Sequence, residues 1–172
     1  MKVHQIVILI MVITASFSAC SKPQSEEDVW QQASQFEKES KFDEAIHGYE
    51  KLVKQFSDGK YAEEALQREA FLYYNNIKDF YKTIECHERL VEDYPESQFA
   101  AQASFMVGYV YANDLKEYEK AEAAYNQFLE LYPESELGES VKWELEHLGQ
   151  DVNEQLINLF GKEESNGSVK SN

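Results

Sequence analysis

The tetrapeptide Tyr94-Pro95-Glu96-Ser97 occurs a second time, at an offset of 38, as Tyr132-Pro133-Glu134-Ser135. A degenerate copy, Phe56-Ser57-Asp58-Gly59, precedes the first by the same interval. The same spacing relates three positions nearby: Tyr49, His87 and Tyr125. A fixed period of roughly 20 to 50 residues is the sequence signature of a repeat architecture. We therefore predict a stack of similar structural units.

The sequence between these tetrapeptides predicts helices. It is rich in Glu, Ala, Lys, Gln and Leu, which are good helix formers. Pro95 and Pro133 punctuate the chain between helices, because proline stops one helix and is tolerated at the start of the next. The expected helices are about 26–39, 43–55 with Asp43 as its cap, 61–74, 80–93, 99–112, 118–131, 137–148 and 151–160. The expected turns within the units are 40–41, 75–79 and 113–115.

The N-terminal segment differs from the repeats in its composition. Lys2 precedes an apolar run over 6–15, and small residues follow before Cys20. This is the layout of a secretory signal peptide, which we place at 1–19. The alternative is a membrane-spanning anchor, but a span needs about 20 apolar residues and this run is half as long.

Residues 17–20 resemble a bacterial lipoprotein signal, with Ala19 and Ser18 at the expected positions and Phe17 in place of the usual Leu. The resemblance implies cleavage after Ala19, acylation of Cys20 by chains such as palmitate, and anchoring to a membrane. Residues 20–27 would form a lipidated tether. Ser21, which follows the cysteine, favours the outer membrane over the inner one, with the protein facing the periplasm.

Charge and motif content exclude several function classes. The net charge of −16 opposes binding to nucleic acid, whose phosphates need basic residues. It either keeps the surface soluble or attracts a basic partner. Cys86 and His87 are neighbours, but adjacent helix residues point in different directions, so we interpret Cys86 as a buried thiol and His87 as a packed core residue. No motif for a cofactor, a metal or a catalytic site is present, and we predict that the chain is not an enzyme.

The helix pattern resembles the tetratricopeptide repeat. Gly108 is predicted to face Ala121, an aromatic residue follows at Tyr111, and Pro133 closes the unit. The resemblance implies an all-α, right-handed solenoid of about three helix pairs over 28–149. A capping helix at 150–161 and a disordered tail at 162–172 would follow. A period of 38 exceeds the usual 34 of this family, and one extra residue is expected in the turn between the two helices of the later units.

The phrases at 49–56, 87–97 and 125–135 resemble the repeats of bacterial envelope lipoproteins. The BamD family of outer-membrane assembly lipoproteins and the C-terminal repeat domain of the CpoB family of Tol-Pal coordinators are the examples. The resemblance implies a groove lined by the first helix of each unit, in which partner proteins or peptides bind. Its residues would be Glu64, Gln67, Phe71, Tyr74 and Asn75 in the second unit and Gln102, Phe105, Tyr109 and Asn113 in the third.

Two interpretations of the groove aromatics remain open, since each is either a binding anchor or part of the packing between units. Asn75 and Asn113 are expected to hold an extended peptide backbone through their amides. The basic residues of a carboxylate clamp are absent from these positions. The sequence thus favours a lipid-anchored adaptor in envelope assembly or maintenance. The alternatives are a Tol-Pal or cell-division coordinator and a self-assembling structural protein.

Overall fold

The computed structural model of the protein describes residues 23–150. The predicted signal peptide, Cys20, the capping segment beyond position 150 and the tail lie outside the described residues. Within that range the chain forms seven α-helices and no strand. They are α2 (Glu26–Lys38), α3 (Phe42–Gln55), α4 (Ala62–Leu72), α5 (Phe80–Asp93), α6 (Ala100–Val110), α7 (Tyr118–Leu131) and α8 (Gly138–Glu146).

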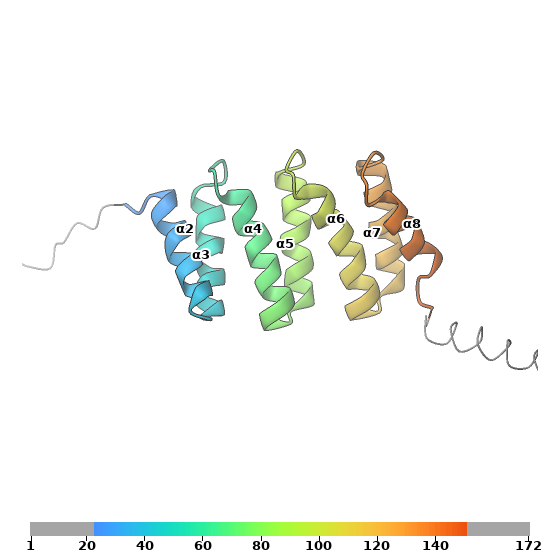
Figure 1. Cartoon of the computed structure of the whole chain (residues 1–172), viewed down its shortest axis with the longest axis horizontal. Coiled ribbons are helices and arrows are strands. Elements are labelled where there is room, and N and C mark those ends of the chain that lie inside the picture. The colour runs from blue at the N-terminus through green and yellow to red at the C-terminus, as the bar shows by residue number, and fades with distance from the viewer. Residues whose placement is uncertain (1–22, 151–172) are drawn as a thin grey trace, which may run out of the picture.

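Each helix packs against the next one along the chain, so the protein is a row of antiparallel helix pairs. Figure 1 shows the pairs side by side along the long axis, from α2 at one end to α8 at the other. The predicted all-α solenoid of three pairs is confirmed, and α8 is the first helix of a fourth unit, as expected. None of the helices described over 23–150 is both long and apolar enough to cross a membrane.

The repeated tetrapeptide builds the connection between units. Tyr94 caps α5 by donating its backbone N–H to Leu90, and Ser97 then donates its own N–H to the Tyr94 carbonyl at 2.9 Å. The Ser97 hydroxyl accepts the backbone N–H of Phe99, which starts the next helix. The second copy repeats all three bonds, at 132, 135 and 137. A local hydrogen-bond pattern therefore fixes the period.

The degenerate copy keeps the turn by other means. Gly59 donates its N–H to the Phe56 carbonyl as its counterparts do, but it has no hydroxyl to cap the next helix. The Glu26 carboxylate reaches across from α2 and accepts the Tyr61 N–H at 2.6 Å instead. A Cβ on residue 59 would overlap that carboxylate. Glycine at this position leaves the space that Glu26 needs.

The turns within the units also repeat with a spacing of 38, at residues in the left-handed backbone region. Ser40, Lys78 and Lys116 have φ of 59°, 64° and 57°. The predicted turns at 75–79 and 113–115 begin too early, because the helix continues there as single π-helical turns, η2 (Tyr73–Ile77) and η3 (Tyr111–Leu115). A π turn takes up an extra residue without ending the helix. The second and third units accommodate their extra residue in this way.

Lysine at a left-handed position is costly, because a Cβ is strained there by about 1–2 kcal/mol. We expect the substitutions Lys78→Gly and Lys116→Gly each to raise the free energy of unfolding by about 1 kcal/mol, measured by urea denaturation. Gly149, which already has a φ of 73°, shows that the chain uses glycine at such a position. Lys82→Gly is the control, because Lys82 lies inside α5 and glycine is unfavourable within a helix. This substitution should therefore destabilise the protein.

Small residues allow close approach of the two helices of a unit. Gly48 lies against Ala33, where an added Cβ would come within 2.7 Å of the alanine methyl. Gly108 lies against the buried Tyr125 ring, and its predicted pairing with Ala121 stays a prediction. The predicted cap at Asp43 is wrong. Lys41 is the capping residue of α3 and makes no side-chain bond, while Asp43 sits in the first turn.

Substituting Gly108→Ala should therefore destabilise the third unit by overpacking. The new methyl would overlap the Tyr125 ring, which is fully buried and has no room to withdraw. We expect a loss of about 1–2 kcal/mol in the free energy of unfolding despite the better helix propensity of alanine. Gly138→Ala is the matched control, because a Cβ there meets no atom within 4 Å, and it should be neutral or stabilising.

Candidate binding groove

The first helices of the units, α2, α4, α6 and α8, form one face of the solenoid. These helices pack mainly on α3, α5 and α7, and hollows lie between them. A hollow between α2 and α4 has a volume of about 620 Å³, and one between α4 and α6 about 290 Å³. A third, of about 220 Å³, lies where η3 approaches α8. The three hollows form a row along this face.

All nine predicted groove residues belong to α4, η2, α6 or η3, and none is fully buried. Five of them line the central hollow: Gln67, Phe71, Tyr74, Asn75 and Gln102. Glu64 lines the first hollow, and Tyr109 and Asn113 line the third. The structure thus spreads eight of the nine over three neighbouring hollows on one face, and Phe105 lines none of the three.

The open question about the aromatics has a different answer for three of the four rings. Phe71 is 49% exposed, and its ring faces solvent beside the Arg68 guanidinium. Phe105 instead packs against Tyr125 at 6.0 Å between ring centroids and supports the core of the third unit. Tyr74 is intermediate, because it packs on Phe80 while lining the hollow. Geometry therefore makes Phe71 an available anchor and Phe105 a packing residue.

The two asparagines have one amide hydrogen already engaged. Asn75 Nδ2 donates to the Phe71 carbonyl at 3.0 Å, and Asn113 Nδ2 donates to the Tyr109 carbonyl at 3.2 Å. Both bonds run back by about one helical turn, from within a π turn to the helix before it. They fix the orientation of each amide and leave its oxygen and second hydrogen for another group.

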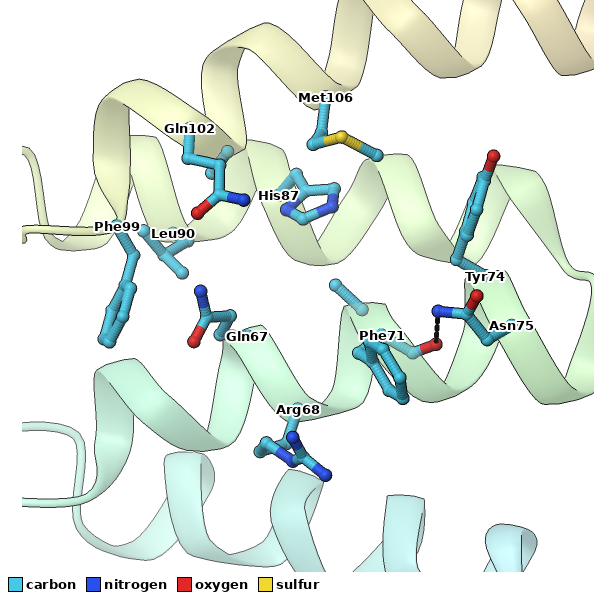
Figure 2. A pocket seen from close by; sticks show the side chains of 12 residues that line it. Gln67, Arg68, Phe71, Tyr74, Asn75, His87, Leu90, Phe99, Gln102 and Met106 are labelled. Carbon is cyan, nitrogen blue, oxygen red and sulfur yellow. Dashed lines mark hydrogen bonds between the residues drawn. The ribbon is translucent and has the colours of Figure 1, made fainter.

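His87 forms the floor of the central hollow. It takes the position that Tyr49 and Tyr125 occupy in the neighbouring units, as the sequence predicts for a packed core residue. Its side chain is 9% exposed, and its Nδ1 is buried without a hydrogen-bond partner in the described structure. Burial disfavours the charged imidazole and lowers its pKa to about 4. Figure 2 shows the ring between α4 and α6, with the Gln67 and Gln102 amides pointing toward one another across the hollow.

Several lining residues were missed by sequence reasoning. They are Arg68, Ala70, Leu90, Phe99, Ala103 and Met106. Arg68 belongs to two hollows and makes a two-point ion pair with Glu37, in which its Nε lies 3.1 Å from Oε2. Glu37 also accepts the Tyr49 hydroxyl at 2.7 Å. The ion pair of Arg68 could not be predicted from the sequence, because Glu37 belongs to the preceding unit.

A buried polar pair lies between α4 and α5. Glu69 is 3% exposed, and its Oε1 accepts a hydrogen bond from the Cys86 thiol at 3.3 Å. Burial raises the pKa of Glu69 to about 7 and also raises the pKa of Cys86. A thiol that stays protonated is a poor nucleophile, so Cys86 is a structural residue. Among residues 23–150 no cluster of side chains is suited to hold a metal ion.

A model of the tetratricopeptide repeat matches residues 102–135, which run from α6 through α7 to the second tetrapeptide. The matched segment is one helix pair, and the structure repeats that pair along the chain. The chain contains tetratricopeptide repeats. No curated protein matches it. Tetratricopeptide repeats generally bind protein or peptide partners, and an all-helical scaffold of this kind is typically not an enzyme.

Proposed function

We propose that this tetratricopeptide-repeat protein is a lipid-anchored adaptor that docks extended partner segments along the α2–α4–α6–α8 face, at the surface of a bacterial membrane. The observation that carries the docking role is the row of three hollows on that face. Phe71 offers exposed aromatic area there, and the asparagine amides are oriented by their own helices. Aromatic surface beside oriented amides suits recognition of a peptide side chain and backbone together.

The membrane location rests on the sequence. The signal-like segment 1–19 and Cys20 support lipidation, and Ser21 supports the outer membrane with the repeats facing the periplasm. Outer-membrane protein assembly or envelope maintenance is the setting that the lipoprotein resemblance favours. A Tol-Pal or cell-division coordinator is the second candidate, supported by the same repeat phrases at 87–97 and 125–135.

Site-specific photo-crosslinking in cells tests the docking face. A photoreactive amino acid at Phe71 or Gln102 should capture one defined envelope protein from both positions. The matched control is Tyr81 on α5, an aromatic residue that is 56% exposed and lies outside the hollows. Capture from Tyr81 but from neither groove position would overturn the assignment of the face.

Two further measurements test the remaining parts of the proposal. Metabolic labelling with an alkyne-tagged palmitate should mark the wild-type protein and leave a Cys20→Ser variant unlabelled. Labelling of neither form would refute the lipid anchor. Sedimentation of a form that begins at Ser21 separates an adaptor from a self-assembling structural protein, because only the latter would associate with rising concentration.

A further inference from the structure

The central hollow has a histidine on its floor, at the position where the neighbouring units carry a tyrosine. In the first unit the Tyr49 phenol extends from α3 toward α2 and donates to Glu37. In the third unit the Tyr125 ring fills the space below Gly108. His87 occupies the same position in the second unit, and an imidazole lacks the outer part of a tyrosine ring. The central hollow, of about 290 Å³, is therefore bordered by an imidazole instead of a phenol.

The lining of this hollow matches an uncharged aromatic side chain. Leu90, Phe99 and Met106 supply apolar surface, and the methionine thioether makes favourable contacts with ring edges. The amides of Gln67, Asn75 and Gln102 are polar groups of the lining. Arg68 is the charged lining residue, and Glu37 already neutralises it. Since a cavity of about 150 Å³ is large enough for benzene, about 290 Å³ holds one phenol ring together with its connection to a backbone.

The surroundings favour basic residues beside that ring. The neighbouring hollow between α2 and α4 is lined by the carboxylates of Glu27, Glu37 and Glu64, against the cations of Lys38 and Arg68. The whole chain carries a net charge of −16. An acidic surface attracts a basic segment and speeds its association, whereas an acidic segment would be repelled.

We infer that the hollow above His87 is the anchor site for a tyrosine side chain, presented by an extended, lysine- or arginine-rich segment of a partner protein. The partner's phenol packs over His87, against Leu90 and Met106. The Gln67 and Gln102 amides lie on either side of the segment's backbone, and Phe71 covers the ring from the rim. This inference rests on the proposed docking function and specifies its partner.

Three synthetic peptides test the chemistry, each acetylated and amidated: KKGYGKK, KKGAGKK and EEGYGEE. Titration followed by NMR should show that KKGYGKK shifts the Met106 methyl and His87 ring signals. Replacing its tyrosine by alanine should weaken binding about tenfold, as expected for an anchor residue. Equal binding of the first two peptides would reduce the interaction to charge attraction and overturn the inference, as would preferential binding of the acidic peptide or no binding by any of them.

Two variants of the protein test the location. His87→Tyr fills the hollow with the residue that the other units carry, so it should abolish the tyrosine-dependent part of KKGYGKK binding without unfolding the protein. Phe71→Ala changes an exposed residue at the rim of the hollow and should weaken the tyrosine-dependent part of KKGYGKK binding severalfold. This second variant tests the location even if His87→Tyr folds poorly. Tyr81→Ala on α5 is the control and should bind normally. Unchanged binding by both groove variants would show that the anchor lies elsewhere.

The crosslinking experiment distinguishes failure of this inference from failure of the proposed function. If the photoreactive group at Gln102 captures the same partner with equal yield in wild-type and His87→Tyr backgrounds, the docking face stands and the tyrosine anchor is wrong. If the yield falls with His87→Tyr while the protein stays folded, the partner uses the hollow. The captured protein should then contain a tyrosine flanked by basic residues within its crosslinked segment.

Discussion

Replacing Glu69 by glutamine should stabilise the protein at pH 8 by about 3 kcal/mol and leave its stability at pH 4.5 nearly unchanged. Glu69 is buried between α4 and α5, and burial raises its pKa from the ordinary 4.5 to about 7. Its Oε2 has no hydrogen-bond partner in the described structure, while Oε1 accepts from the Cys86 thiol. Arg89 favours the charged form of Glu69 from α5, and Glu50 and Glu85 oppose it. The protonated carboxyl is therefore the form that suits the fold.

The direction of the pH dependence follows from linkage. A carboxyl whose pKa is higher in the folded state contributes its full stability below pH 4.5, and that contribution is lost as the pH rises through 7. One pH unit between the two pKa values corresponds to about 1.4 kcal/mol, which sets the figure of about 3 kcal/mol. A glutamine amide has similar shape and does not titrate.

Urea denaturation of wild type and Glu69→Gln at pH 4.5, 6 and 8 provides the measurement. The difference between the two proteins should grow with pH and level off above pH 7. Glu122→Gln, an exposed position on α7, should show no such growth. A constant difference across the three pH values would mean that Glu69 is ionised throughout or protonated throughout.

The period of the sequence predicts most of this fold because a local hydrogen-bond pattern encodes it. Tyr94 and Ser97 make their turn bonds with groups close by in the sequence, so the repeated tetrapeptide is sufficient to mark the junctions at 94–97 and 132–135. The turns within the units were harder to place. Lys78 and Lys116 are left-handed residues that composition gives no reason to expect, and the π turns before them look like ordinary helix in the sequence.

The binding face was predictable in outline and its hollows were not. The register of the first helices identifies Gln67, Phe71 and Gln102 as residues of one face, because helix periodicity fixes which side chains lie together. Their surroundings depend on contacts between units, such as the pair of Arg68 with Glu37. The repeated position of His87 predicted that it packs in the core, and the structure adds that it forms the floor of a hollow.

His87 should make the protein lose stability in acid, in the direction opposite to Glu69. Its pKa is lowered by burial from the ordinary 6.5 to about 4. A histidine with a lowered pKa in the folded state contributes its full stability above pH 6.5, and the contribution is lost as the pH falls through 4. By the same conversion the loss amounts to about 3 kcal/mol once the pH is below 4.

Substituting His87→Tyr should remove this acid sensitivity, because tyrosine at this position stays neutral and fits the packing seen in the other units. We expect the free energy of unfolding of the variant to exceed that of wild type by a margin that is small at pH 7 and grows toward pH 4. His47→Tyr is the matched control, because it makes the same substitution at an imidazole that is 84% exposed. Combining Glu69→Gln with His87→Tyr should leave a stability that varies less between pH 4 and 8 than in either single variant. If the double variant instead keeps the wild-type slope, the titrating groups lie elsewhere in the solenoid and the buried centre of the second unit is not what makes its stability respond to pH.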